Sequence, residues 1–147
     1  MTSALSGEHM ASRVKEKYPE SIEESTSEYL VVKGDSLLNV ARYLRDTDDL
    51  KLDFFNYVTA VDYYSYFEVV YQLTSTVHNH SIVLKTRCHD RDNPSVPSVV
   101  SLWQGADLQE REIFDLMGIR FEGHPNLKRL FLWEGFQGHP LRKDYLS

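Results

Sequence analysis

Apolar and polar residues alternate with a period of two along the middle of the chain. The run 54–61 is rich in aromatic and β-branched residues, and residues 66–74 and 81–88 alternate apolar with polar side chains. Such alternation is typical of strands with one buried face, and the short polar turns at 62–65 and 78–80 predict hairpins. This part of the chain therefore predicts an antiparallel β-meander.

Before the meander the pattern changes to the spacing of helices. Residues 7–18 have moderate helical character and end at Pro19, and Leu37, Val40, Ala41 and Leu44 lie on one face of a second helix. The apolar run within residues 28–33 predicts a strand between these two helices. We expect an α+β fold, with a meander of about four strands covered by helices.

The segment after the meander is polar and then apolar again. Residues 89–97 hold two prolines and predict an exposed crossover loop. Residues 98–103 most simply form a helix that leads into the next one. After Gly123 the chain has much apolar surface with few signs of regular structure, which predicts an extended, irregular tail that packs against a partner. At 147 residues the chain fits one domain, 1–147, with an α/β core half over about 1–98 and a helix and partner-binding tail over about 99–147.

Unusual residues are densest in the helix predicted to begin at Asp107. Asp107 can cap its first turn, and Glu110 three residues later gives the spacing of a capping box. Arg111 is placed between Asp107 and Asp115, as a structural ion-pair network requires. Gly118 follows the last apolar pair and can take the left-handed conformation that ends a helix.

Two Gly-His-Pro turns follow the helix and have the same order of residues. One is Gly123-His124-Pro125, and the other is Gly138-His139-Pro140. Proline restricts the residue before it to extended conformations, so both histidine backbones should be extended and fixed.

Composition excludes several classes of function. The net charge of −6 argues against a broad phosphate-binding surface and so against nucleic acid, although Lys128, Arg129, Arg142 and Lys143 make the end locally basic. Cys88 is the single cysteine, so this chain alone can form neither a disulfide nor a four-thiolate iron–sulfur cluster. We see no dinucleotide, P-loop or serine-hydrolase motif.

The chain also lacks the usual signs of export or of membrane insertion. Its first residues have neither the basic nor the long apolar region of a signal peptide, and no segment approaches about 18–20 uninterrupted apolar residues. We therefore expect a soluble, cytoplasmic protein that associates with a membrane only through partners.

The string from Glu110 to Tyr145, EREIFDLMGIRFEGHPNLKRLFLWEGFQGHPLRKDY, resembles the signature of one family of respiratory proteins. This family is the C subunit of type I NADH dehydrogenase, the 30 kDa-type subunit of respiratory complex I. The resemblance is specific over about residues 99–146, and the earlier part is similar only in its pattern of elements. It implies an α+β unit of the peripheral arm, packed against the D subunit near the quinone-reducing end.

The resemblance also implies cofactors, partners and site residues. It implies no cofactor in this chain, with FMN and iron–sulfur clusters in partner subunits. It further implies an obligate hetero-oligomer with neighbouring subunits that include the D subunit, and a peripheral place on the cytoplasmic face of the inner membrane. The complex would move electrons from NADH to quinone and pump protons.

No residue is assigned to catalysis, cofactor or metal. The residues expected to sustain the fold and the contacts between subunits are Glu110, Arg111, Glu112, Asp115, Gly118, Gly123, His124, Pro125, Arg129, Gly138, His139, Pro140, Arg142, Lys143 and Asp144. The chain ends soon after Tyr145, so we expect that contacts made by the C-terminal extension of some family members are missing.

Two alternatives stay open. One is the equivalent subunit of a related assembly, a membrane-bound hydrogenase or a ferredoxin-dependent photosynthetic complex. The other is a stand-alone metal-dependent enzyme that uses Glu110, Glu112, His124 and His139.

Overall fold

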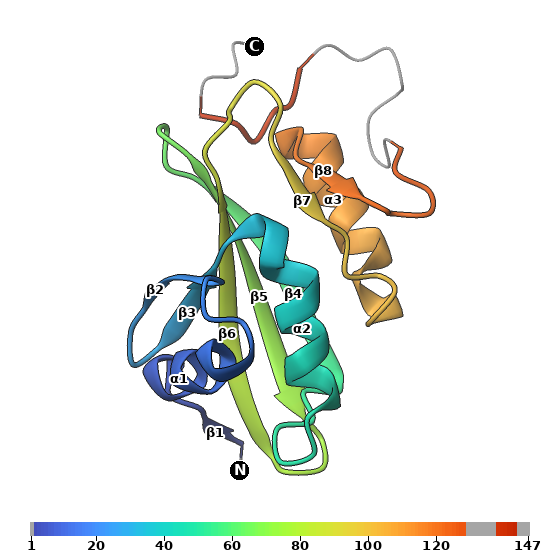
Figure 1. The fold of residues 1–147 in the computed structure, drawn as a ribbon. Coiled ribbons are helices and arrows are strands. Elements are labelled where there is room, and N and C mark those ends of the chain that lie inside the picture. Colours follow the sequence, from blue (N-terminus) through green and yellow to red (C-terminus); the bar gives the residue numbers. More distant parts are fainter. Residues whose placement is uncertain (1, 129–137, 144–147) are drawn as a thin grey trace.

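The computed structural model describes residues 2–128 and 138–143. Within them the chain forms three α-helices, eight strands and two short 3₁₀ turns (Figure 1). The helices are α1 (Gly7–Lys17), α2 (Leu37–Asp46) and α3 (Asp107–Met117), and the 3₁₀ turns are η1 (Gly34–Ser36) and η2 (Gln104–Ala106). The strands are β1 (Ser3–Ala4), β2 (Ile22–Ser25), β3 (Tyr29–Val32), β4 (Phe54–Asp62), β5 (Phe67–Ser75), β6 (His80–Cys88), β7 (Ser95–Pro97) and β8 (Arg120–Glu122).

The main sheet has the strand order β2-β3-β6-β5-β4, and β1 pairs beside β6. The predicted hairpins are confirmed, because β4 pairs with β5 and β5 with β6, both antiparallel. The prediction of a wholly antiparallel meander is wrong for the first of its four strands. Strand β3 runs parallel to β6, because the chain between β3 and β4 passes through α2. The sheet is therefore mixed, and the α+β class holds.

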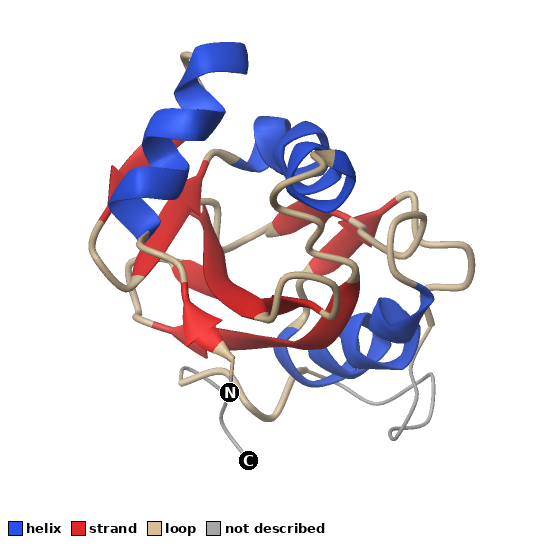
Figure 2. Cartoon of the chain, turned by 90° about the horizontal axis from the view of Figure 1, so that it is seen from below, coloured by secondary structure: helices blue, strands red, loops and turns tan. Residues whose placement is uncertain are grey.

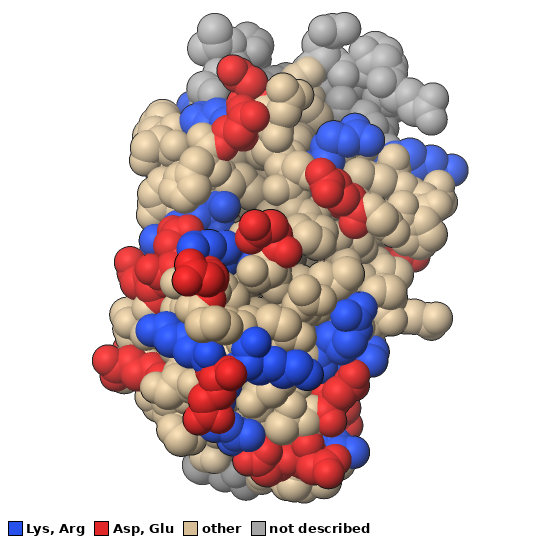
Figure 3. Space-filling view, in the orientation of Figure 1, with Lys and Arg blue, Asp and Glu red and all other residues tan. Residues whose placement is uncertain are grey.

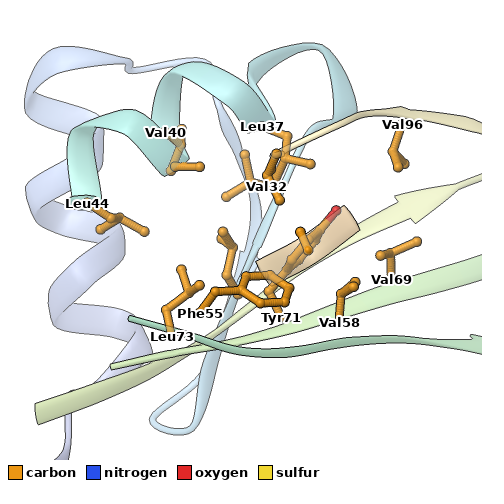
Figure 4. Close-up of a cluster of buried hydrophobic side chains, with 14 of the residues drawn as sticks. Val32, Leu37, Val40, Leu44, Phe55, Val58, Val69, Tyr71, Leu73 and Val96 are labelled. Atoms are coloured by element: carbon orange, nitrogen blue, oxygen red, sulfur yellow. The ribbon is translucent and has the colours of Figure 1, made fainter. Parts of the chain in front are cut away.

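Alternation along β5 explains which face of the sheet is buried. Phe67, Val69, Tyr71 and Leu73 on this strand are at most 1% exposed. The helices lie against the sheet in the view of Figure 2. Val40 and Leu44 of α2 point down onto Tyr71 and Leu73 (Figure 4). A fully buried aliphatic or aromatic side chain contributes about 1.5–3 kcal/mol, so this layer supplies much of the driving force for folding.

Residues 89–103 differ from the prediction. Strand β7 lies inside the expected loop and pairs parallel with β8, and its Val96 is buried. Residues 98–103 form turns instead of a helix. The backbone N–H groups of Leu102 and Trp103 both donate to Val99 O, and the indole N–H of Trp103 donates to Leu52 O at 3.1 Å. The bond from Trp103 to Leu52 spans 51 residues and holds this segment in its turns, against the local helical pattern.

Candidate functional site around helix α3

The predicted site residues gather at the two ends of α3. The segment 138–143 lies at the C-terminal end of α3 (Figure 1), and its Lys143 N–H donates to Asp62, the last residue of β4. Arg129 and Asp144 lie outside the described residues.

Glu110 is a buried structural carboxylate instead of half of a capping box. The helix is preceded by Ala106, with no side-chain cap, and Glu110 is 0% exposed. Its two oxygens accept hydrogen bonds from Ser98 Oγ at 2.6 Å and from the Val99 N–H at 2.9 Å. Burial raises the pKa of Glu110 above its usual value, and the two hydrogen bonds oppose part of that rise. The carboxyl group therefore ties α3 to the turn after β7.

Replacing Glu110 by glutamine should change how stability depends on pH. Because its pKa is raised in the folded state, wild-type protein should lose stability relative to Glu110→Gln as pH rises from about 4.3, the unfolded value, through the folded pKa. Denaturant unfolding at pH 4 to 8 measures this difference. Glu112→Gln, an exposed change on the same helix, should leave the profile parallel to wild type. A difference for Glu110→Gln that does not vary with pH would contradict the buried-carboxylate account.

His124 lies in the first Gly-His-Pro turn and contacts the start of α3. Its side chain is 0% exposed. The Asn126 N–H donates to Nδ1 at 2.9 Å, and Nε2 lies 3.2 Å from the backbone oxygen of Asp107 and 2.9 Å from its Oδ1. Gly123 has a φ of 84°, which permits the turn, and Pro125 is exposed. The histidine thus braces the chain after β8 against the first turn of α3.

The second Gly-His-Pro turn caps the other end of α3. Gly118 is left-handed, as predicted, with a φ of 77°, and its N–H donates to Phe114 O. The last carbonyls of a helix have no partner within it. Here three are satisfied from residues 139–142. His139 Nδ1 donates to Asp115 O at 2.9 Å, the Leu141 N–H to Leu116 O at 3.0 Å, and Arg142 Nε to Met117 O.

This capping segment, residues 138–143, is also joined to the end of β4. Asp62 is 3% exposed and accepts four hydrogen bonds, two from Arg91 at 2.6 and 3.1 Å, one from the Tyr64 N–H and one from the Lys143 N–H, both at 2.8 Å. The Arg91 guanidinium is the main cause of a pKa of Asp62 well below its usual range, and the two backbone donors lower it further. The guanidinium groups of Arg91 and Arg142 lie 4.5 and 5.0 Å from the centre of the Phe67 ring.

The ion-pair network predicted around Arg111 is wrong. Among the described residues Arg111 pairs with neither Asp107 nor Asp115, because Asp107 lies against His124 and Asp115 is buried. The Nε atom of Arg111 is buried without a hydrogen-bond partner in the same part of the chain. Glu112 is exposed on the opposite side of the helix from Glu110.

The residues of the metal hypothesis are not brought together. Glu110 and His124 lie near the start of α3 and His139 at its end, while Glu112 faces solvent. No group of three or more potential ligands lies close enough for a metal in residues 2–128 and 138–143. In the described part of the chain these four residues therefore do not form one site.

Sequence reasoning missed Asp62 and Arg91. Asp62 is the acidic residue that ends an apolar strand, which is a weak signal, and Arg91 lies in a polar segment that predicted a solvated loop. Their pairing spans 29 residues and is completed by Lys143, 81 residues from Asp62, so no local spacing reveals it.

Comparison with known proteins identifies the family. The family model described as the 30 Kd subunit of respiratory-chain NADH dehydrogenase matches residues 30–147. The chain belongs to this family. The C subunit of NADH-quinone oxidoreductase from Roseiflexus castenholzii is 47% identical over 116 residues, which cover 77% of this chain and 66% of that protein. The corresponding protein of Cupriavidus metallidurans is 40% identical over 143 residues, which cover 90% and 72%.

The family member described here spans about two thirds of the length of the first of these curated relatives. Its fold also resembles a chain in the structure of the membrane-bound sulfane sulfur reductase, an archaeal respiratory membrane complex. The TM-score is 0.74 at 24% identity, covering 95% of this chain and 85% of the other. The resemblance at that identity shows a shared fold. No helix in the described part of the chain is long and apolar enough to span a bilayer.

Proposed function

We propose that this chain is the 30 kDa-type component of a proton-translocating NADH:quinone oxidoreductase. In this proposal it is a peripheral-arm subunit on the cytoplasmic face of the membrane, without a cofactor of its own, and it scaffolds the quinone-reducing module against the D subunit. The observation that carries the proposal is the family match over residues 30–147, which includes all the predicted site residues.

The site geometry supports a scaffold better than a reaction centre. The polar groups that were candidates for catalysis or metal binding make contacts within the fold. Glu110 accepts a hydrogen bond from Ser98 in the turn after β7, His124 contacts Asp107, and Asp62 is paired with Arg91. A buried carboxylate with all its oxygens satisfied fixes a conformation. Acidic and basic side chains are interspersed over the face shown in Figure 3, which fits contacts with proteins better than with nucleic acid.

A tagged pull-down from gently solubilised membranes tests the proposal. Recovery of the D subunit together with an NADH-oxidising flavoprotein, with NADH:quinone reductase activity, is the expected result. The D subunit with a different input module would assign the chain to a related complex, such as a membrane-bound hydrogenase or a ferredoxin-dependent one. Recovery of the chain alone in the soluble fraction would refute the proposal.

Arg111→Ala should weaken assembly of the complex without affecting its turnover. The Arg111 side chain is half-buried and makes no ion pair in the described residues, so its guanidinium can serve a partner. We expect less assembled complex and normal turnover per assembled complex, measured by native gel and quinone reductase assay. Arg42→Ala, which removes an exposed arginine on α2, is the control and should leave both unchanged. Normal assembly with lost turnover would count against the scaffold role.

A further inference from the structure

The two edges of the main sheet are protected unequally. Strand β2 at one edge has four residues and carries the exposed Glu23 and Glu24. Strand β4 at the other edge has nine residues, and its first eight, 54–61, include no charged residue and no proline. Natural sheets usually guard an edge with short strands, charges or proline, because unpaired backbone groups on an edge attract another strand. The β4 edge has none of these three features, although it carries a bulge between Phe55 and Tyr57 and contacts α3 at Val58.

The outward backbone groups of β4 can be assigned from one hydrogen bond. The Val58 N–H donates to Gln109 Oε1 of α3 at 2.8 Å, so residue 58 directs its backbone away from β5. Backbone direction alternates along a strand, and Ala60 therefore directs its N–H and C=O the same way. No hydrogen bond joins the Ala60 backbone to α3 or to residues 138–143. Ala60 thus offers one donor and one acceptor along the edge.

Two hollows lie along the same edge. The first, of about 110 Å³, lies between Val58–Ala60 of β4, Leu116 of α3 and Leu141. The second, of about 320 Å³, lies beside the start of β4, where Trp103 and Phe54 line it. Phe54, Tyr57 and Leu141 border this edge and are 51%, 43% and 60% exposed. The hollows are about five residues apart on β4, one of which is the extra residue of the bulge, so they lie roughly 13 Å apart at the rise of a strand.

The charges that line the hollows are acidic. Asp53 in the second hollow accepts hydrogen bonds from the N–H and hydroxyl of Thr76. Glu112 in the first hollow is exposed and has no ion pair within the described ranges. No Lys or Arg lines either hollow. The edge is thus matched to a segment that carries a positive charge opposite Glu112.

We propose that the β4 edge binds an extended segment of a partner subunit, which adds a short strand at Ala60. Its apolar side chains, about four residues apart and so on one face of the strand, fill the two hollows, and a Lys or Arg lies against Glu112. Main-chain hydrogen bonds would supply affinity, and the hollows would supply specificity, as in other cases of strand addition. This inference rests on the proposed function, because it requires a multi-subunit complex.

Photo-crosslinking in the intact complex tests the proposal. Tyr57 is replaced by the photoreactive benzoylphenylalanine in the tagged chain, and the complex is isolated from gently solubilised membranes. We expect one adduct with one partner, on a segment that contains Lys or Arg. Val77, which is 65% exposed on the turn between β5 and β6, is the control position and should not give that adduct. A Tyr57 adduct with lipid or with a second copy of this chain, the same adduct from both positions, or no adduct would overturn the inference.

Charge variants at Glu112 give a second measurement. Glu112→Lys should reduce the yield of the Tyr57 adduct by about tenfold or more, because like charges at an interface are strongly unfavourable, and Glu112→Gln should reduce it less. The exposed position should leave the melting temperature unchanged. An adduct yield that neither variant alters would overturn the charge pairing. If no partner co-purifies, the proposed function fails as well, whereas a complete complex without the Tyr57 adduct overturns this inference alone.

Discussion

Replacing Asp62 by alanine is expected to destabilise the fold by about 3–5 kcal/mol, the range for breaking a buried ion pair by removal of one partner. The carboxylate accepts four hydrogen bonds and is 3% exposed. Its loss leaves the Arg91 guanidinium without the carboxylate it is paired with, and the N–H groups of Tyr64 and Lys143 lose their acceptor. Denaturant unfolding at pH 7 measures the effect.

The Asp62 effect should also depend on pH, with the sign opposite to that of Glu110. The pKa of Asp62 is lower in the folded state than in the unfolded state. Its contribution to the free energy of unfolding is therefore present above the unfolded-state pKa of about 3.9 and is lost as pH falls through the folded-state pKa. The difference between wild type and Asp62→Ala should therefore shrink below pH 4.

Two controls define the Asp62 result. Asp92→Ala removes an exposed carboxylate from the neighbouring loop and should change stability by about 0.5 kcal/mol or less. Adding Arg91→Met to Asp62→Ala should restore part of the loss, since the charge that was paired with the Asp62 carboxylate is then removed as well. A cost for Asp62→Ala no larger than that of the control would show that the carboxylate does not hold the segment 138–143.

Gly118→Ala should destabilise the protein by about 2–5 kcal/mol. The left-handed conformation costs an L-residue about 1–2 kcal/mol, and overpacking costs about 1–3 kcal/mol more. The overpacking arises because a Cβ at Gly118 would lie 2.7 Å from the His139 ring and 2.8 Å from the Arg142 guanidinium. The substitution should thus push the capping segment off the end of α3.

Gly123→Ala is the matched control for Gly118→Ala. Gly123 has a similar φ of 84°, but a Cβ there meets nothing within 4 Å, so only the backbone cost of about 1–2 kcal/mol applies. Hydrogen exchange of the Leu141 amide, which donates to Leu116 O, should become faster in Gly118→Ala and stay slow in Gly123→Ala. Equal costs for both variants would contradict the packing of residues 139–142 against the helix end.

The contrast between Gly118 and Asp62 shows what the sequence can predict. A glycine after the last apolar pair of a helix is a local signal, and the left-handed end of α3 follows from it. The strands β4 to β6 follow from period-two alternation in the same way. The pairing of Asp62 with Arg91 and Lys143 depends on how distant elements pack, and residue spacing does not encode it.

Glu110 and residues 98–103 fail the local prediction for one shared reason. An acidic residue in a first helical turn normally faces solvent and caps, and an apolar run normally continues a helix. Here the Glu110 side chain is turned into the core, where it accepts the Ser98 hydroxyl and the Val99 N–H. Ser98 and Val99 therefore donate hydrogen bonds to the Glu110 carboxylate, and the helix predicted over residues 98–103 does not form.

The capping of α3 by residues 139–142 sets an order for synthesis on the ribosome. The strands and helices up to Met117 are synthesised before the residues that cap α3. The carbonyls at the end of α3 and one bond of Asp62 must wait for residues 24 to 81 positions further along. Until residues 139–142 have left the ribosome, three carbonyl oxygens at the end of α3 therefore lack the donors that they have in the folded protein.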